Sequence, residues 1–324
     1  MRIGYFLSTE EYAPSELIEQ AVLAEEAGFE ALTISDHFHP WNDEQGQSPF
    51  VWSMIGAISQ RCSLPVMTAV TCPMMRISPV ITAQAAATAS VLLDGNFRLG
   101  VGTGEALNEH IHGDDWPPAG VRLEMLEEAV EVMQELWTGD VVNHRGKHFT
   151  VEHARIYTLP EKPPEVFVSG LGRKSTMIAA RLGDGYITSK NNEEMIELFR
   201  TESGGKPVVC TTKVAWADTE DEGIGHAHRL WATSLLPGEF GQILPTPQHF
   251  EQGATLVTEE MTREKTVAGP DVDRHVEELM SYAGNDELYV TNIGPHYAEM
   301  IKAYGAEVLP AVRRQLSLDK EGGA

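Results

Sequence analysis

Three residues that can transfer a proton and one tryptophan stand close together in the stretch SDHFHPW at positions 35–41. Asp36, His37, His39 and Trp41 follow the apolar run ALTI, which is typical of a buried strand. An imidazole titrates at a pKa of about 6.5, so it can take or give a proton near neutral pH. Because Asp, Ser and Pro also end strands and form turns, a structural and a catalytic interpretation are both open at this point.

A second stretch, GVGTGEALNE at positions 100–109, places a carboxylate in a glycine-rich turn after an apolar run. Its glycines let the backbone approach a flat or phosphorylated ligand, although their spacing differs from the dinucleotide pattern Gly-x-Gly-x-x-Gly. A carboxylate in such a turn suits a general acid, so Glu105 is a candidate for proton transfer.

A third stretch, VSGLGRKST at positions 168–176, joins a predicted strand to a predicted helix. Arg173 and Lys174 fall at the start of that helix, after Gly170 and Gly172. Free backbone amides, the helix dipole and two cations together favour an anion, so this loop is predicted to bind a phosphate group.

Three His-x-His pairs occur, at positions 37/39, 110/112 and 226/228. On a strand such a pair shares one face and can chelate a metal, as in metal-dependent barrel hydrolases. Those enzymes need further His and Asp ligands at other strand ends, and the predicted strands FVSG and YITS offer none. The sequence therefore predicts no metal site.

The elements that must position these motifs alternate between short apolar runs and longer amphipathic ones, which indicates parallel strands joined by crossover helices. Eight strand candidates begin near Arg2, Glu30, Leu64, Phe97, Glu165, Gly185, Pro207 and Glu287. Eight such units predict one (β/α)₈ barrel domain over residues 1–324, with insertions near 105–120, 140–160 and 236–265. In a barrel, catalytic residues sit at the C-terminal ends of strands, so SDHFHPW and GVGTGEALNE should share one rim.

Residues 140–160 are predicted to form a hairpin excursion centred on Arg145 and Gly146, and the stretch from about 237 to 258 is predicted to be irregular. The chain has 24 basic and 48 acidic residues, a net charge of −24 that argues against binding nucleic acid or an anionic membrane surface. Three cysteines without a CxxC motif, and no signal-like or membrane-spanning segment, predict an unprocessed cytoplasmic protein.

The motifs SDHFHPW, GVGTGEALNE, CPMMR, VFVSGLG and GDGYITS together closely resemble the luciferase-like barrel superfamily. Within it, the chain resembles the coenzyme F420-dependent glucose-6-phosphate dehydrogenases and related alcohol dehydrogenases. The resemblance implies hydride transfer between the carbinol carbon of a small alcohol or sugar-type substrate and C5 of the deazaflavin, and it implies a homodimer. Two alternatives stay open: an FMN-dependent monooxygenase, and a coenzyme-binding protein without turnover.

The resemblance also assigns roles to residues. His37 would take the proton of the substrate hydroxyl, Trp41 would shape the pocket, and Glu105 would act at the N1 side of the ring. The coenzyme would be contacted by Asp36, Ala69, Val70, Cys72, Thr103, Gly104, Asn108, Gly170, Leu171, Gly172, Arg173, Lys174 and Ser175. The peptide bond between Ala69 and Val70 is expected to be cis.

The substrate site departs from the sugar-phosphate members, which clamp the phosphate with a threonine, two lysines and an arginine. Ser189 and Lys190 stand near the first two positions. The second lysine region reads PGEFGQILP without a basic residue. Near the arginine position Glu264 falls on the match, and Arg263 beside it is the third candidate substrate residue, with Ser189 and Lys190. A phosphate without charge-assisted bonds binds weakly, so the sequence argues against glucose 6-phosphate itself.

Overall fold

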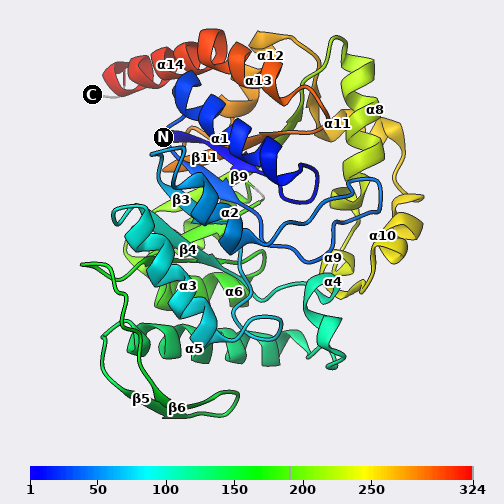
Figure 1. The fold of residues 1–324 in the computed structure, drawn as a ribbon. Helices are drawn as coiled ribbons and strands as arrows, with labels where there is room; N and C mark the ends of the chain where they lie inside the picture. Colours follow the sequence, from blue (N-terminus) through cyan, green and yellow to red (C-terminus); the bar gives the residue numbers. More distant parts are fainter. Residues whose placement is uncertain (190, 323–324) are drawn as a thin grey trace.

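Eight parallel strands close into a ring in the computed structural model, which describes residues 1–189 and 191–322 (Figure 1). Each strand pairs with the next, and the last one pairs with the first. In ring order the strands are β1 (Arg2–Leu7), β2 (Leu32–Ile34), β3 (Val66–Thr68), β4 (Phe97–Val101), β7 (Glu165–Ser169), β8 (Gly185–Thr188), β9 (Val208–Ala215) and β11 (Glu287–Asn292). The predicted (β/α)₈ barrel and its eight strand positions are confirmed.

The helices surround this ring (Figure 1). Those up to β8 are α1 (Pro14–Ala27), α2 (Val51–Ile58), α3 (Pro79–Leu92), α4 (Ala106–Glu109), α5 (Ala119–Leu136) and α6 (Arg173–Leu182). The later ones are α7 (Glu193–Ser203), α8 (Glu220–Trp231), α9 (Phe240–Ile243), α10 (Pro247–Ala254), α11 (Glu259–Lys265), α12 (Val272–Met280), α13 (Tyr297–Ala303) and α14 (Leu309–Gly322). Short 3₁₀ turns lie at His110–His112 and Ala232–Leu235, and a π-turn at Tyr304–Val308 joins α13 to α14.

Side chains alternate along the strands between the barrel interior and the helix layer. Phe6, Met67, Phe167 and Tyr289 belong to the small buried cluster inside the barrel, whereas the larger core cluster lies between sheet and helices. A Cβ atom at Gly4 would come within 2.2 Å of the Tyr289 ring, so a glycine is needed there to make room for the aromatic side chain.

The β5–β6 hairpin projects from the barrel at the lower left of Figure 1. It consists of β5 (Val142–Arg145) and β6 (Thr150–Ala154), which confirms the predicted hairpin around Arg145 and Gly146. Glu128 of α5 anchors its turn by accepting hydrogen bonds from the backbone amides of residues 147–149 at 2.8 to 3.1 Å. Strand β10 (Val267–Ala268) adds a short edge to β9.

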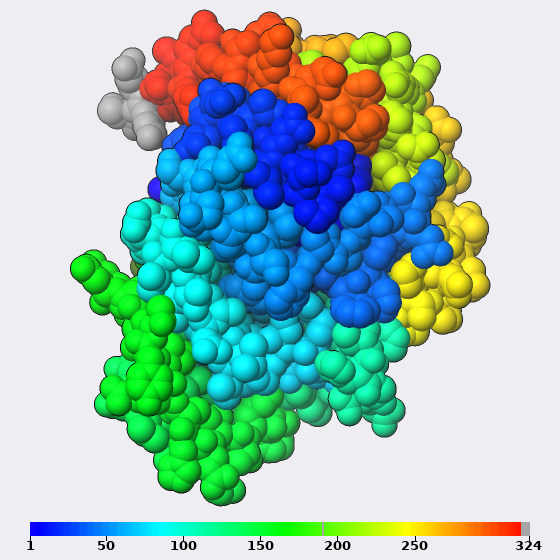
Figure 2. Space-filling view, viewed as in Figure 1, coloured from blue at the N-terminus to red at the C-terminus, as the bar shows by residue number. Residues whose placement is uncertain are grey.

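The stretch expected to be irregular contains α9 and α10, so that prediction was wrong. Helix α10 begins where the Thr246 hydroxyl caps it and Pro247 occupies its first turn, both of which favour helix initiation. The segment reaches across to the loop before α2: Trp41 packs edge-on against Phe250, with ring centroids 5.1 Å apart. The space-filling view shows these two segments, blue and yellow, meeting at the surface (Figure 2).

Among the described residues, no helix has the length and apolar character needed to cross a membrane. Cys62, Cys72 and Cys210 are buried and none forms a disulfide.

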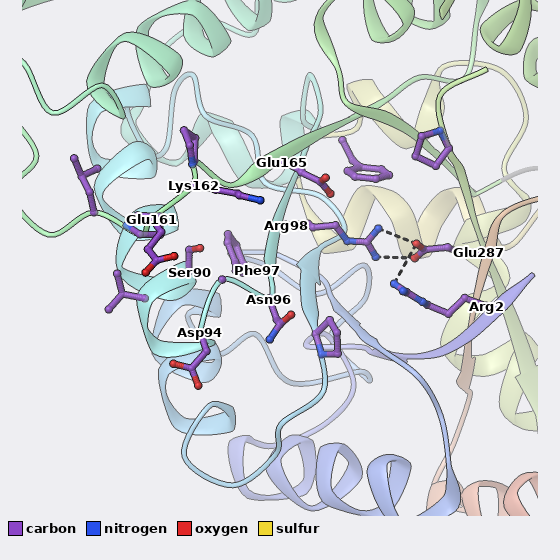
Figure 3. A pocket seen from close by; sticks show the side chains of 18 residues that line it. Arg2, Ser90, Asp94, Asn96, Phe97, Arg98, Glu161, Lys162, Glu165 and Glu287 are labelled. Carbon is purple, nitrogen blue, oxygen red and sulfur yellow. Dashed lines mark hydrogen bonds and ion pairs between the residues drawn. The ribbon is translucent and has the colours of Figure 1, made fainter. Parts of the chain in front are cut away.

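A network of charges lies at the N-terminal ends of the strands, in a cavity of about 930 Å³ (Figure 3). Arg98 donates to both carboxylate oxygens of Glu287, at 2.9 and 2.6 Å. Tyr289 donates to the same carboxylate at 2.7 Å, and Arg2 lies 3.4 Å from it. Burial would raise the pKa of Glu287, but these donors and charges outweigh it and lower the pKa.

Candidate active site

A second cavity, of about 310 Å³, opens at the C-terminal ends of the strands. The predicted site residues that line it are His37, Trp41, Ala69, Val70, Glu105, Leu171 and Ser189. They follow β2, β3, β4, β7 and β8, so residues far apart in sequence meet at one rim as the barrel requires.

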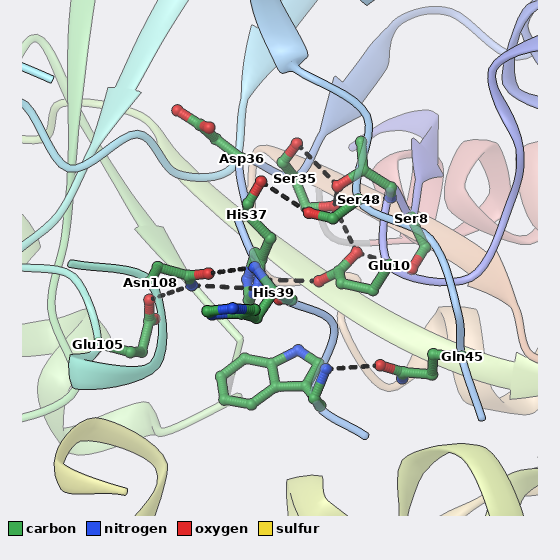
Figure 4. Close-up of polar contacts among 12 residues, drawn as sticks. Ser8, Glu10, Ser35, Asp36, His37, His39, Gln45, Ser48, Glu105 and Asn108 are labelled. Carbon is green, nitrogen blue, oxygen red and sulfur yellow. Dashed lines mark hydrogen bonds and ion pairs between the residues drawn. The ribbon is translucent and has the colours of Figure 1, made fainter. Parts of the chain in front are cut away.

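His37 is the centre of the polar contacts in this cavity (Figure 4). Its Nε2 atom lies 3.4 Å from Oε1 of Glu10, and only 10% of its side chain is exposed. The Trp41 ring stands beside the imidazole, with centroids 5.0 Å apart. Nδ1 lies 3.1 Å from the carbonyl oxygen of His39. A neutral imidazole carries one proton: on Nδ1 it is donated to that carbonyl and Nε2 keeps a lone pair that can accept a proton, whereas on Nε2 it points at Glu10 and Nδ1 becomes an acceptor.

Glu10 was missed by the sequence interpretation, although it stands directly after β1 at the same rim. Its Oε2 atom accepts hydrogen bonds from the hydroxyls of Ser35 at 2.6 Å and Ser8 at 3.0 Å. Burial acts to raise the pKa of Glu10, but His37 and these hydroxyls outweigh burial and hold it below its usual value. The pair of carboxylates in LSTEEY, after the first strand, was the available sequence signal.

Asn108 joins the loop after β2 to the loop after β4. Its Oδ1 atom accepts hydrogen bonds from the backbone amides of Phe38 at 2.8 Å and His39 at 3.1 Å. Its Nδ2 atom therefore faces the other way, 3.1 Å from Nδ1 of His37 and 3.4 Å from Oε2 of Glu105. The amide thus lies against both predicted proton-transfer residues, and it can donate to Nδ1 of His37 when the imidazole proton is on Nε2.

His39 turns away from the cavity. Its Nδ1 atom contacts the carbonyl oxygen of Leu107 at 2.9 Å, which ties the loop after β2 to α4. The side chain does not line the cavity. Its role here is structural.

The Asp36 carboxylate points away from His37 (Figure 4). It is buried and binds Arg76 at 2.7 Å and the Thr71 hydroxyl at 2.8 Å, and it does not line the cavity. Arg76 also lies 3.5 Å from Glu109, whose pKa burial raises to about 7 despite that cation. The structure therefore places Asp36 in an ion-pair cluster beneath the loops, and any coenzyme contact by its carboxylate would compete with Arg76.

The loops after β3 and β4 pack tightly against one another. The peptide bond between Ala69 and Val70 is cis, as expected. Gly104 has a positive φ of 70°, and a Cβ atom there would come within 2.8 Å of the sulfur of Cys72. Burial raises the pKa of the Cys72 thiol well above its usual value, so it is a neutral packing group. Thr103 precedes Gly104 in this turn and, like Cys72 and Gly104, does not line the cavity.

The predicted phosphate loop forms the start of α6, next to the cavity residue Leu171. Gly172 is the N-cap residue, and its carbonyl accepts a hydrogen bond from the Ser175 hydroxyl at 2.8 Å. A Cβ atom at Gly170 would meet that hydroxyl oxygen at 2.7 Å. Arg173 and Lys174 are exposed and form no hydrogen bond or ion pair with any described residue.

Of the predicted substrate residues, the structure describes Ser189 and Arg263, and it does not bring these two together. Ser189 lines the cavity, and Lys190 lies outside the described residues. Arg263 lies on α11 and binds Asp221 at 2.8 Å, with two further carboxylates within 3.7 Å. Arg263 does not line the cavity, where we expected it to bind substrate, because carboxylates of α8 and α11 hold its charge instead.

Lys213 of β9 was also missed by the sequence interpretation. It lines the cavity, and its Nζ atom lies 4.4 Å from the centroid of the Trp231 ring, a cation–π contact. Burial lowers the pKa of Lys213 below its usual value, although the negative charges of Glu10 and Glu11 act to raise it. Among the described lining residues it is the only lysine or arginine.

A family model described as luciferase-like monooxygenase matches residues 1–285. The chain belongs to this family. Its relatives include an F420-dependent glucose-6-phosphate dehydrogenase of Mycolicibacterium smegmatis, 33% identical over 97% of this chain and 98% of the relative. The dehydrogenase of that name from Microbacterium testaceum is 31% identical over 98% of this chain and 99% of the relative.

Among solved structures, this luciferase-like chain is similar to an F420-dependent secondary alcohol dehydrogenase in complex with an F420-acetone adduct. The TM-score is 0.88 and the identity is 31%, over 96% of this chain and 98% of the other. The similarity in fold extends over nearly the whole of both chains.

Proposed function

We propose that this protein is a coenzyme F420-dependent dehydrogenase that oxidises a CH–OH group. The observation that carries the proposal is the buried pair of His37 and Glu10 in the cavity, 3.4 Å apart, facing Glu105 through the amide of Asn108. The relatives that cover nearly the full chain are named F420-dependent dehydrogenases, which supports the same coenzyme and reaction class.

The residues of the cavity fit a deazaflavin coenzyme. Phe6, Val70, Leu171 and Ile187 offer apolar surface to a planar ring. At the start of α6, next to Leu171, the helix amides and two exposed cations, Arg173 and Lys174, suit a phosphate-bearing tail. The predicted contacts by Thr103, Gly104, Asn108 and the 170–175 loop are retained as part of this proposal.

When bound, F420 would supply the hydride acceptor; the protein would orient the substrate and handle the proton. His37 would accept the hydroxyl proton at Nε2 while its Nδ1 proton is donated to the carbonyl of His39. The Glu10 carboxylate, held by two serine hydroxyls, would stabilise the resulting imidazolium. Trp41 would exclude water from that face, and Glu105 would exchange a proton or hydrogen bond with the coenzyme ring.

We propose that the substrate is a neutral alcohol or polyol and not a phosphate ester. Glu10 and Glu105 give the described cavity wall two carboxylates against the single cation Lys213. A dianionic phosphate would be repelled by that balance, and Arg263 is held elsewhere by carboxylates. Hydroxyl and amide side chains complete the polar wall and suit hydroxylated substrates: Ser169, Ser189, Thr211, Thr212, Thr233, Ser234 and Gln242.

Fluorescence titration of the purified protein with F420 and with FMN tests the coenzyme. We expect saturable F420 binding and much weaker FMN binding. Tight FMN binding without an F420 response would instead support the flavin-dependent monooxygenase alternative. F420 binding without turnover of any alcohol would support the non-catalytic alternative.

A substrate panel followed by the loss of oxidised F420 absorbance tests the substrate class. The panel pairs each sugar phosphate with its unphosphorylated sugar, and adds secondary alcohols and polyols. We expect the neutral member of each pair to give the higher kcat/KM. A higher kcat/KM for glucose 6-phosphate than for every neutral compound would overturn this part of the proposal.

We further propose a cytoplasmic homodimer. Three buried free thiols suit a reducing compartment. The shallow groove between α2 and α3 is lined mainly by Trp52, Ile55, Ile81 and Leu92, and its apolar rim suits contact with a second copy. Sedimentation of the wild type and of Ile81→Lys tests the dimer: we expect the variant to shift toward monomer, and a monomeric wild type would contradict it.

A further inference from the structure

Two histidines and a glutamate converge on the outside of the barrel, away from the residues that line the active-site cavity. Glu222 and His226 lie one turn apart on α8, and His296 caps the start of α13. Oε1 of Glu222 is 3.7 Å from Nε2 of His226 and 3.4 Å from Nε2 of His296. One ligand atom from each of the three lies within 4.8 Å of the others.

The His226 ring is held with one nitrogen buried and unused. Its Nε2 atom is inaccessible to solvent and has no hydrogen-bond partner among the described residues. Such a group is costly to bury unless something binds it. Gly294 leaves room for the His226 ring, because a Cβ atom there would meet the His226 side chain at 3.1 Å. The φ of Gly294 is positive, at 88°.

We propose that Glu222, His226 and His296 bind a divalent transition-metal ion of the Zn²⁺ class. Two imidazoles and one carboxylate are ordinary zinc ligands. Bonds of 2.0 to 2.2 Å give neighbouring ligands of a tetrahedral ion a separation of about 3.4 Å. The two separations from Glu222, 3.4 and 3.7 Å, are close to that value, and the ligand atoms of the two rings, which lie within 4.8 Å of each other, would close on the ion. Water would complete the coordination.

Arg229 competes with a metal ion for the His226 ring. It donates a hydrogen bond from Nη2 to Nδ1 of His226 at 3.1 Å. A ring that binds a metal through Nε2 carries its proton on Nδ1, so Arg229 must release that contact. Its Nε atom binds Glu44 at 3.0 Å and its side chain is half exposed, so the guanidinium has room to turn away from the ring toward solvent.

The metal would connect α8 to the segment after β11. Helix α8 ends at Trp231, which lines the active-site cavity, and the segment after β11 is held by the Tyr12 hydroxyl, which donates to the carbonyl of Gly294 at 2.7 Å. Bound metal therefore stabilises the folded arrangement of this side of the barrel without touching the cavity.

Isothermal titration of the metal-free protein with Zn²⁺, together with its thermal midpoint with and without Zn²⁺, tests the proposal. We expect one tight site per chain and a rise in Tm. His226→Ala and His296→Ala should weaken that site by roughly tenfold or more and abolish the rise in Tm. His228→Gln is the matched control on the same helix, because its ring binds the carbonyl of Val257 and not the cluster.

Two further variants keep the test decisive. Glu222→Gln changes an exposed side chain, so it should fold normally and still lose affinity; it replaces either histidine variant if that one fails to fold. Arg229→Met removes the competing donor and should bind Zn²⁺ more tightly than the wild type. Wild type that binds no Zn²⁺, or His226→Ala and Glu222→Gln that bind it as tightly as wild type, would overturn the assignment.

Discussion

At the N-terminal end of the barrel, Glu287 accepts contacts on both oxygens from Arg98, and Tyr289 and Arg2 complete its shell. At the C-terminal end, Glu10 has its Oε2 filled by two serine hydroxyls, while Oε1 faces His37 at 3.4 Å. The N-terminal cavity is the larger, about 930 against 310 Å³. Cavity size therefore does not distinguish the end that we propose to be functional. A buried charged group that can still form hydrogen bonds is the better indicator of a ligand site, because a group whose hydrogen bonds are all made has none left for a ligand.

The largest expected effect is at the C-terminal end. His37→Ala should lower kcat by about 10²- to 10⁴-fold, the usual loss of a general base. F420 affinity should stay nearly unchanged, because the imidazole is proposed to act on the substrate. Steady-state rates from F420 absorbance and a fluorescence titration measure the two quantities. A variant with full turnover would contradict the proposed role.

The opposite pattern is expected at the N-terminal end. Glu287→Gln leaves Arg98 buried without its counter-charge and should lower the free energy of unfolding by about 3 kcal/mol. Its kcat, measured well below the unfolding transition, should equal that of the wild type. Denaturant unfolding gives the first quantity and the activity assay the second. A large loss of kcat in the folded variant would show that the two ends are not separate in function.

The pH dependence of stability sharpens the comparison further. The folded protein lowers the pKa of Glu10 below its ordinary value of 4.5, so its stabilising contribution is full above that pH and is lost as the pH falls through the folded pKa. The stability difference between wild type and Glu10→Gln should therefore be largest at neutral pH and shrink below about pH 4. Unfolding curves at several pH values measure it; a constant difference would count against the ionised carboxylate.

The smallest effect is expected at Arg263. Its charge is held by surface carboxylates of α8 and α11, so Arg263→Gln should leave kcat/KM within about twofold of the wild type for any substrate. Kinetics on the best neutral substrate and on glucose 6-phosphate check this. A selective loss with the phosphate ester would place Arg263 in the substrate site after all.

The strands were predictable because each parallel strand is buried on both faces and is therefore a short apolar run. The helix α10 was missed because its start depends on a single capping threonine and a proline within a polar stretch. The rim position of His37 and Glu105 followed from barrel geometry. The charged residues around them did not: Glu10 beside His37, Arg76 beside Asp36 and Lys213 in the cavity wall are ordinary charged residues in sequence, and only the closed barrel decides which charges meet.

Asn108 has a consequence for how a ligand would be received. Because its amide accepts from the loop after β2 and faces both His37 and Glu105, the two loops are joined before anything binds. Ordering loose loops would otherwise subtract from affinity on every binding event. Here those side chains already lose their conformational entropy on folding. The rim is therefore preorganised for a ligand, and the barrel strands determine its shape.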